Sequence, residues 1–294
     1  MHYLRYPKLK IFHWQLLLLS LFCYLVNCFS FSLIFNLILN IHNFYHFLQY
    51  KYSYYFYNIK IMKALFFDIF GTLVDWRTSL ISEIKKNKII KENDLYIEKF
   101  VINWRLEYQP ILNEVNKKKI PWMLLDELHF ISLNHVLKKM KINHLSENQK
   151  RELIYCWHKL RPWSDSVNGL ISLNEKFITS SLSNGSIALQ KNLVKHANLK
   201  FNFLISAENF KKYKPDLSVY LRAATTLGFK PQECGLVASH KNDLLAASKV
   251  GFNTIFIKRE KEYGNFFYKF PKTSYEPNIS ISSLDNLIDI IFKK

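Results

Sequence analysis

The segment that best indicates the fold of this chain is Lys63-Ala-Leu-Phe-Phe-Asp68-Ile-Phe-Gly71-Thr72-Leu-Val-Asp-Trp-Arg77. Its apolar run, residues 64–67, has the length of a buried parallel β-strand. The run ends on Asp68, and the carboxyl ends of strands in an open α/β sheet are where ligands bind. Gly71 allows the next turn to fold close over a ligand, with Thr72 in reach as a donor. The local alternative is an aspartate that only caps the turn.

Length and charge set broad limits on the protein. The chain has 294 residues, enough for one large or two modest domains, and a formal net charge of +18 at pH 7. Its lysines are scattered, whereas a nucleic-acid binder shows a concentrated basic stripe with stacking aromatics. We therefore expect no nucleic-acid partner.

The four cysteines indicate a reducing compartment. Cys23, Cys28, Cys156 and Cys234 show neither metal-ligand spacing nor a disulfide-rich pattern. We therefore expect a cytoplasmic protein, with Cys234 in the core beside a predicted strand.

Residues 1–61 differ from the rest of the chain. They contain five Lys or Arg residues and no Asp or Glu. Residues 16–38 are long and apolar enough for a transmembrane helix, which would make this a single-pass, membrane-anchored protein of undecided orientation. No small-residue cleavage site follows, which argues against a signal peptide. We favour an upstream extension of the reading frame, because Met62 stands directly before the first predicted strand.

The block of residues 78–165 has the pattern of helices alone. Apolar residues recur at helical spacing over residues 97–108, and Pro110 should bend or end that helix. Pro121 is expected to open another helix. The apolar side of that helix is expected to comprise Leu124, Leu128, Ile131 and Val136. No strand pattern interrupts the block, so a helical cap domain over residues 78–165 is predicted.

After this block, predicted strands alternate with predicted helices. The strands are 177–182, 203–206, 235–238, 254–257 and 279–281, and the helices are 186–196, 217–227, 243–250 and 284–292. Gly251 stands where a helix C-cap is expected. The alternation predicts an α/β fold with a doubly wound parallel sheet, in which residues 62–77 and 166–294 form the core.

Polar side chains follow successive predicted strands. Ser183 and Asn184 follow the second strand and open a helix, whose backbone N–H groups form a ready anion site. Lys214 follows the third strand, and His240 and Asp243 follow the fourth. Because the carboxyl ends of parallel strands lie at one edge of the sheet, we expect these groups to converge with the carboxylate after the first strand.

Together these segments resemble the haloacid dehalogenase superfamily, and most closely its type II (S)-2-haloacid dehalogenase branch. The resemblance covers residues 62 to about 265. It rests on the phrases FDIFGTLVDWR, NWRLEYQP, PWMLLDELH, LSNGS, KPDLSVY, ASHKNDLLAAS and KREKEYG. It implies a Rossmann-like core with an inserted helical cap, in agreement with the pattern of strands and helices.

The resemblance implies covalent catalysis. Asp68 matches the nucleophile that attacks C2 of a 2-haloacid and displaces halide, which gives an aspartyl ester that water hydrolyses. Lys214 matches the lysine that keeps this carboxylate ionised, although an ordinary helix-start lysine is the alternative. Asp243 matches the acidic residue of the fourth strand end. Tyr220 fits the family's spacing from the lysine, or is a core tyrosine.

The resemblance also implies which groups bind substrate and halide. Arg105 matches the cap arginine that receives the leaving halide together with Asn184, where a cation stabilises charge as it develops. A solvated arginine is the alternative. Ser183, Thr72 and the backbone after Asp68 match the groups that hold the substrate carboxylate.

Two features favour dehalogenation over phosphatase chemistry. Phosphatases of the superfamily place a second aspartate two residues after the nucleophile. That position is Phe70 here, which we also assign to the substrate and halide site. Because a halide leaves without a proton, no acid is required at this position. Phosphatases also hold Mg²⁺ with several carboxylates, whereas this chain offers Asp68 and Asp243 alone, which are few ligands for Mg²⁺. We therefore expect no metal and no other cofactor.

The chain departs from the type II pattern near the last aspartate. The branch often has Ser and Asn where Ala238 and His240 stand. His240 could position or activate the hydrolytic water, or be a structural histidine bonded to its loop. Arg77 could contact a substrate carboxylate or pair with Asp75, and we favour the pair.

The sequence therefore predicts a hydrolase that converts a short (S)-2-haloacid and water into the (R)-2-hydroxy acid and halide. One alternative is a related hydrolase for another small carboxylate or phosphate ester. Another is a membrane-tethered protein whose site only binds a ligand. The expected partner is the small-molecule substrate; a membrane is a partner only if residues 1–61 are made. Homodimers are common in the family.

Overall fold

The computed structural model describes residues 39–45, 62–264 and 274–292. Residues 39–45 are helical, and the predicted spanning segment, residues 16–38, lies outside the described residues. Among the helices within the described ranges, none combines the length and the apolar character that crossing a bilayer requires. The chain divides into two compact units, Met1–Tyr57 and Asn58–Lys294, and the second contains the sheet.

Parallel strands form the centre of the second unit. They make a 6-stranded sheet in the order β5-β4-β1-β6-β7-β8. Their bounds are β1 (Ala64–Phe67), β4 (Ile178–Ser183), β5 (Phe203–Ser206), β6 (Cys234–Ala238), β7 (Asn253–Ile257) and β8 (Ile279–Ile281). The apolar run of β1 is buried throughout and lies between β4 and β6, with Phe67 opposite Ser181 and Val237. A strand covered on both faces is uniformly apolar for this reason.

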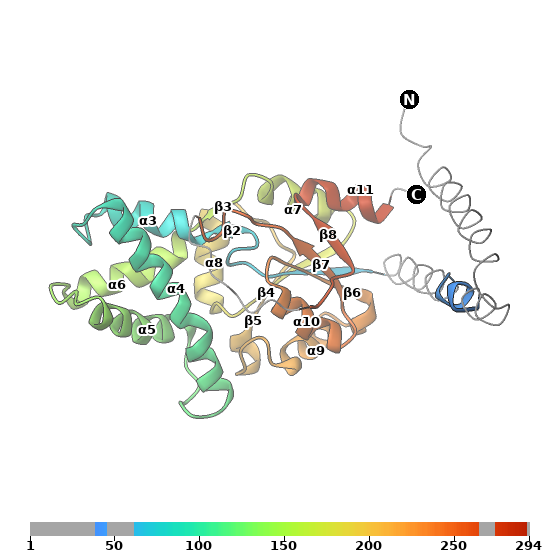
Figure 1. Cartoon of the computed structure of the whole chain (residues 1–294), viewed down its shortest axis with the longest axis horizontal. Helices are drawn as coiled ribbons and strands as arrows, with labels where there is room; N and C mark the ends of the chain where they lie inside the picture. Colours follow the sequence, from blue (N-terminus) through green and yellow to red (C-terminus); the bar gives the residue numbers. More distant parts are fainter. Residues whose placement is uncertain (1–38, 46–61, 265–273, 293–294) are drawn as a thin grey trace, which may run out of the picture. The chain divides into compact units, whose positions relative to one another are not determined.

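Helices cover both faces of the sheet. They are α7 (Ser166–Asn174), α8 (Ile187–His196), α9 (Leu217–Thr226), α10 (Lys241–Lys249) and α11 (Leu287–Phe292), with the 3-10 helices η2 (Ala207–Phe210), η3 (Pro231–Glu233) and η4 (Leu284–Asn286). Helices α7 and α11 lie on one side of the sheet, and α9 and α10 on the other (Figure 1). The predicted α/β class with a doubly wound parallel sheet is confirmed.

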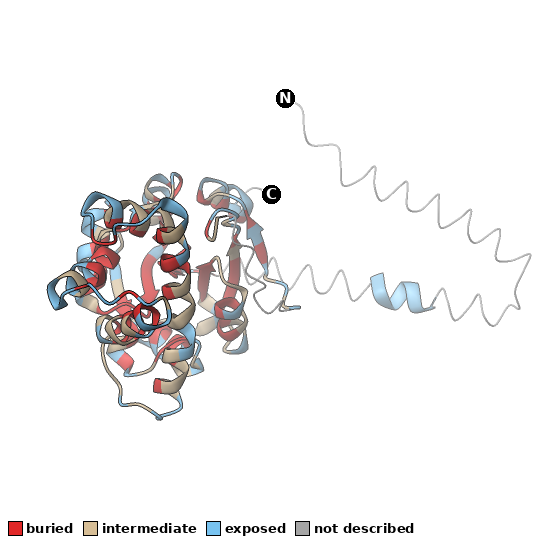
Figure 2. Ribbon diagram, turned by 60° about the vertical axis from the view of Figure 1, so that its left-hand side comes forward, coloured by how far each residue is buried: buried red, intermediate tan, exposed pale blue. Residues whose placement is uncertain are grey.

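Burial follows this layered arrangement. Buried residues gather along the strands and on the helix faces that meet them (Figure 2). Phe66 of β1 is fully buried and packs its ring against Phe252, with the centroids 5.5 Å apart. Cys234 is buried in β6, as predicted. Gly251 follows the last residues of α10 with φ +100°, which confirms the predicted C-cap.

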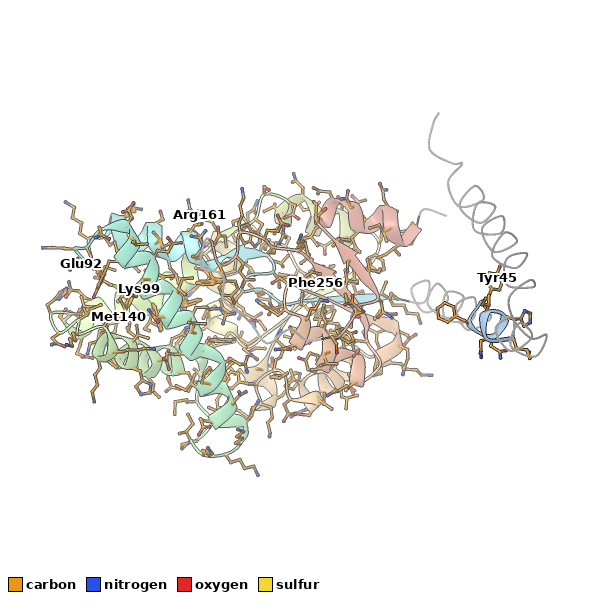
Figure 3. The ribbon with its side chains drawn as sticks, in the orientation of Figure 1. Tyr45, Glu92, Lys99, Met140, Arg161 and Phe256 are labelled. Atoms are coloured by element: carbon orange, nitrogen blue, oxygen red, sulfur yellow. The ribbon has the colours of Figure 1, made fainter. Side chains whose placement is uncertain are left out.

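A helical segment is inserted between β1 and α7. It consists of α3 (Trp76–Lys86), α4 (Asp94–Asn116), α5 (Leu125–Lys139), α6 (Glu147–Cys156) and the 3-10 helix η1 (Trp157–Lys159). Helix α4 packs against α3 and α5, and α6 packs against the same two helices. In Figure 3, Glu92, Lys99 and Met140 lie in this segment and Phe256 lies in the sheet, with Arg161 between them. We retain residues 78–165 as a predicted cap.

The predicted boundaries of two helices in this segment are wrong. Pro110 does not end helix α4, which continues to Asn116 with buried residues on both sides of the proline, so of the predicted bend or end only the end is contradicted. Helix α5 begins at Leu125 rather than at Pro121, since the Glu127 side chain accepts a hydrogen bond from the N–H of Leu124 at 2.7 Å and caps the first turn there. Of its predicted apolar side, Leu128 and Val136 are buried, whereas Leu124 and Ile131 are half-buried.

A short antiparallel ribbon lies at the base of the inserted segment, where no strand was predicted. Strand β2 (Val74–Asp75) pairs with β3 (Arg161–Pro162). Two-residue strands are too short to show an alternating pattern, which is why the sequence did not indicate them.

The predicted pair of Arg77 with Asp75 is also wrong. Asp75 caps α3 instead, because its side chain accepts hydrogen bonds from the N–H of Thr78 at 3.0 Å and from its hydroxyl at 2.5 Å. Arg77 extends from the first turn of α3 to α4, where its guanidinium lies 2.6 Å from Glu98 Oε1. Asp75 thus stabilises the start of α3, and Arg77 links α3 to α4.

Phe66→Ala should destabilise the fold strongly. Phe66 is fully buried, whereas Phe203, on edge strand β5, is 49% exposed. Because truncation of a buried ring leaves a cavity, we expect the free energy of unfolding to fall by about 3–5 kcal/mol. Phe203→Ala, the matched control, should cost about 1 kcal/mol. Urea unfolding measures both, and equal losses would contradict the packing described here.

Candidate active site

Asp68 lies at the carboxyl edge of the sheet, directly after β1. Its N–H donates to the carbonyl of Val237 at 3.0 Å, which holds its backbone beside β6. The hydroxyl of Thr72 donates to Asp68 Oδ2 at 2.8 Å and accepts a hydrogen bond from the N–H of Ser239 at 2.9 Å. Gly71 adopts φ +82° in the intervening turn, a conformation that favours glycine. The turn therefore brings the predicted donor, Thr72, under the carboxylate.

Lys214 lies between two carboxylates. Its Nζ is 2.9 Å from Asp68 Oδ1 and 2.5 Å from Asp243 Oδ2. Its backbone N–H donates to Asn184 Oδ1 at 2.8 Å, which ties the segment after η2 to the end of β4. The hydroxyl of Tyr220 donates to Asp243 Oδ1. The structure thus brings four residues that follow different strands, together with Tyr220 of α9, to one edge of the sheet.

The charges in this cluster keep Asp68 ionised. Burial alone would raise the pKa of Asp68, but the positive charges of Lys214 and His240 outweigh burial and hold this pKa well below its usual range. Burial would lower the pKa of Lys214, yet Asp243 and Asp68 raise it. Burial raises the pKa of Asp243, and the nearby Asp68 adds to this rise against the opposing charge of Lys214. Asp68 is therefore the carboxylate that is ionised most readily.

His240 joins Asp68 to a third carboxylate. Its Nδ1 is 3.4 Å from Asp68 Oδ2, and its Nε2 is 2.9 Å from Glu262 Oε1. Burial would lower the pKa of His240, but Glu262 and Asp68 raise it to about 10. The imidazole is therefore positively charged at neutral pH. Its side chain is 28% exposed, so it remains in contact with solvent.

Arg105 of α4 lies among aromatic rings. Its guanidinium carbon is 4.3 Å from the ring centroid of Tyr108 and 5.6 Å from that of Trp76. Burial would lower the pKa of Arg105, but Tyr263, Tyr108, Glu262 and Asp68 raise it, in that order. Its Nε is buried with no hydrogen-bond partner among the described residues. This cation therefore retains a donor that is available to an anion.

An aromatic layer separates the helical segment from the sheet edge. Trp157 stacks on His129 at 4.5 Å and meets Trp104 edge to face at 5.5 Å. Phe70 meets the same Trp157 at 5.9 Å. Burial lowers the pKa of His129 to about 3, so this histidine is neutral. Such a layer excludes water and strengthens the electrostatic interactions beneath it.

Phe70, Ser183 and Asn184 lie close together at the end of β4. A Cβ built on Gly185 would be 3.3 Å from the ring of Phe70, so the ring lies directly against this glycine. The N–H of Gly185 donates to Ser183 Oγ at 3.1 Å. The residues named from the sequence for this site thus lie together at one edge of the sheet, except for Arg105. Arg105 lies on helix α4, close enough to Asp68 for this carboxylate to raise its pKa.

Three residues near the carboxylate were not assigned from the sequence. Glu262 contacts His240, and Trp76 and Tyr108 flank the Arg105 guanidinium. All three lie inside phrases that carry the family resemblance, but their spacing from Asp68 in the chain gave no indication of contact. Only the fold brings them together.

The carboxylates of this cluster do not form a cation cage. In the described ranges, no group of three or more His, Cys, Asp or Glu residues has a geometry that would hold a metal ion. The Lys214 ammonium already lies between Asp68 and Asp243 and pairs with both. The absence of a metal requirement remains a prediction.

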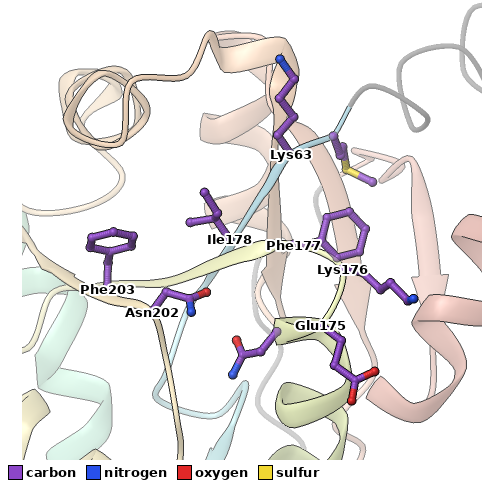
Figure 4. Close-up of a pocket in the computed structure, with 9 residues that line it drawn as sticks. Lys63, Glu175, Lys176, Phe177, Ile178, Asn202 and Phe203 are labelled. Carbon is purple, nitrogen blue, oxygen red and sulfur yellow. The ribbon is translucent and has the colours of Figure 1, made fainter.

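A groove lies at the opposite edge of the sheet. It is lined by residues that precede or begin strands, among them Lys63, Phe177 and Phe203 (Figure 4). None of its lining residues belongs to the cluster around Asp68. Ligands of open α/β sheets bind at the carboxyl ends of strands, so this groove is not the candidate active site.

Comparisons with known proteins give a consistent result. The family model for haloacid dehalogenase-like hydrolases matches residues 62–251. The (S)-2-haloacid dehalogenase 4A of Burkholderia cepacia is 28% identical over 231 residues, which are 76% of this chain and 93% of that protein. The (S)-2-haloacid dehalogenase 1 of Pseudomonas sp. (strain CBS-3) is 29% identical over 67% of this chain and 85% of its own length.

Solved structures are similar as well. The L-2-haloacid dehalogenase PA0810 has a TM-score of 0.71 at 35% identity and covers 78% of this chain and 98% of its own. The defluorinating L-2-haloacid dehalogenase Rha0230 has a TM-score of 0.73 at 33% identity and covers 78% of this chain and 95% of its own.

His240 should make stability depend on pH in the alkaline range. Its pKa is raised from 6.5 to about 10 in the folded protein, so its contribution is complete below pH 6.5 and is lost as the pH rises through 10. The free energy of unfolding of the wild type should therefore fall more steeply over this range than that of His240→Asn. Urea unfolding at several pH values measures the difference. The exposed His196 supplies the control, and His196→Asn should follow the wild type; parallel curves for all three proteins would contradict the paired imidazolium.

Proposed function

Because this chain belongs to the haloacid dehalogenase-like hydrolases, we propose that it is an (S)-2-haloacid dehalogenase that hydrolyses the carbon–halogen bond of a short 2-haloalkanoic acid. The observation that carries the proposal is the ionised Asp68 carboxylate, held by Lys214 at 2.9 Å at the carboxyl end of the central strand. The names of the relatives with 28–35% identity support the same reaction class.

In the proposed reaction Asp68 is the nucleophile. One of its carboxylate oxygens attacks C2 of the substrate from the side opposite the halogen, so the configuration inverts and halide leaves with the bonding electrons. The product of this step is an ester between Asp68 and the substrate. Water then hydrolyses the ester and releases the (R)-2-hydroxy acid, so two easier steps replace one difficult step. Lys214 holds the attacking carboxylate in place, Asp243 holds Lys214, and Tyr220 holds Asp243.

Halide and substrate carboxylate require separate anion sites. We assign the halide to Arg105, Asn184 and Phe70, because the Arg105 guanidinium has a free donor and stabilises negative charge that develops only as the bond breaks. We assign the substrate carboxylate to Ser183, Thr72 and the backbone that follows the nucleophile, because hydroxyl and N–H groups are donors to a carboxylate.

The proposed reaction needs neither a metal ion nor a general acid for the leaving group. Phe70 occupies the position two residues after Asp68, is 4% exposed and has no proton to donate. Halide is a weak base and leaves without a proton. A phosphate ester, in contrast, releases an alkoxide that needs one.

Asp68→Asn should abolish halide release. The amide is neutral and a poor nucleophile, so the covalent route is lost, and we expect the rate to fall by about 10⁴-fold or more. Halide release from (S)-2-chloropropionate, assayed with EDTA present throughout, measures this. The control is Asp94→Asn, whose side chain is 77% exposed on α4 and which should retain wild-type activity.

The same assay tests the rival hydrolase. Release of phosphate from a small phosphate ester that requires Mg²⁺, with no halide released from any 2-haloacid, would overturn the dehalogenase proposal. Retained halide release in Asp68→Asn would overturn the assignment of the nucleophile.

Arg105→Lys should slow halide release while the protein stays folded. The shorter, point-like ammonium cannot reproduce the stacked guanidinium on Tyr108, so we expect kcat/KM to fall by about 10²–10³-fold. Steady-state kinetics with (S)-2-chloropropionate measure the change. Arg151→Lys, at an exposed position of α6, is the matched control. An unchanged kcat/KM in Arg105→Lys would show that this cation does not receive the halide.

A further inference from the structure

Asp68, His240 and Glu262 form a continuous chain of contacts. His240 Nδ1 faces Asp68 Oδ2 at 3.4 Å and His240 Nε2 faces Glu262 Oε1 at 2.9 Å, so each ring nitrogen addresses a different carboxylate. One ring nitrogen of His240 thus faces the proposed nucleophile, Asp68. The other faces Glu262, to which the proposed reaction assigns no role.

Glu262 is held firmly in this position. Its side chain is 5% exposed, and its Oε1 also accepts a hydrogen bond from the indole N–H of Trp76 at 2.9 Å. The Ser239 hydroxyl donates to its Oε2 at 3.5 Å. A Cβ built on Gly71 would lie 2.2 Å from Glu262 Oε1, so the turn that follows Asp68 has room for this carboxylate only because position 71 is glycine. A buried carboxylate fixed by several donors is well suited to orient a partner ring.

We propose that Glu262 is the positioning residue of a His240–Glu262 pair in which His240 accepts the proton of the water that hydrolyses the Asp68 ester. This inference rests on the proposed dehalogenase function. It assigns the pair to the second step of that reaction and not to the attack on C2.

The other groups around Asp68 are unsuited to this task. In the described part of the chain, the side chains that hydrogen-bond or pair with Asp68 belong to Thr72, Lys214 and His240. The Thr72 hydroxyl is a very weak base. Lys214 is an ammonium whose pKa is raised by Asp243 and Asp68 against the effect of burial. The imidazole is protonated while Asp68 is ionised, and it can act as a base once the ester has removed the negative charge of Asp68.

The charge of His240 changes between the two steps. Before the reaction, the ring faces two carboxylates, Asp68 and Glu262, and carries a proton. Arg105 acts on the Glu262 carboxylate of this pair. Ester formation removes the negative charge of Asp68, so one of the two groups that stabilise the imidazolium is lost. His240 also stands at the N-cap of α10, where the helix dipole disfavours a cation. The 28% exposure of the side chain gives the released proton a path to solvent.

The hydrolytic step balances with these groups alone. The water oxygen bonds to Cγ of Asp68 while one water proton passes to His240 Nδ1. The bond between Cγ and the substrate oxygen then breaks, and the product oxygen leaves with the electron pair and takes that proton. The remaining acid proton on Asp68 passes to His240, which restores both the carboxylate and the imidazolium. Glu262 holds the Nε2–H throughout, so that Nδ1 is the free nitrogen.

The test separates ester formation from ester hydrolysis. Halide leaves in the first step, so a variant defective only in the second step should release about one halide per enzyme in a burst and then turn over slowly. We expect this in Glu262→Gln and His240→Asn with (S)-2-chloropropionate, with hydrolysis slowed about 10²–10⁴-fold and the esterified protein visible by intact-mass spectrometry of quenched samples. Thermal unfolding of each variant shows that the protein is folded.

Matched controls remove the same chemical groups elsewhere. The controls are Glu233→Gln and His196→Asn. Glu233 lies directly before β6 at the other edge of the sheet, and His196 lies at the exposed end of α8. Both should show no burst and no esterified protein beyond the wild-type level.

Several outcomes would overturn the inference. Folded Glu262→Gln and His240→Asn variants that turn over at the wild-type rate, or that lose halide release without a burst and without the ester, would show that the pair does not act in hydrolysis. A wild-type protein that releases no halide from any 2-haloacid would overturn the proposed function first, and the inference with it. A burst in His240→Asn but not in Glu262→Gln would remove the role of Glu262 alone.

Discussion

The ammonium of Lys214 between Asp68 and Asp243 is the interaction on which the site depends. Two carboxylates at this distance from one nitrogen would repel each other if the cation were removed, and burial would then favour protonation of one of them. The cation therefore permits an ionised carboxylate in a nearly closed site. The position of Lys214 in turn depends on Asn184, which accepts a hydrogen bond from the Lys214 backbone N–H. Residues after four different strands therefore fix the position of the ammonium.

Much of the fold could be predicted from sequence because its causes are local. Apolar runs such as residues 64–67 and 235–238 are buried on both faces and are recognisable without their neighbours. The family phrases then located Asp68, Lys214 and Asp243. Their convergence follows from the rule that parallel strands share a carboxyl edge.

What could not be predicted depends on contacts between distant loops. Glu262 and Trp76 are 186 positions apart, and neither residue has a local pattern that indicates a partner. Arg77 was expected to pair with Asp75, but it pairs with Glu98 because the Asp75 side chain caps helix α3. The role of His240 was left open because one ring can bond to its loop or to a reacting group; only the positions of both ring nitrogens distinguish these arrangements.

The indole of Trp76 has a consequence for how the enzyme would move. Trp76 is the first residue of α3, directly after strand β2, and its N–H donates to the Glu262 carboxylate that contacts His240. A rotation of the inserted helices that carried the indole away would leave Glu262 with one donor fewer. In the proposed mechanism, the orientation of the His240 ring would then depend on the position of the inserted helices.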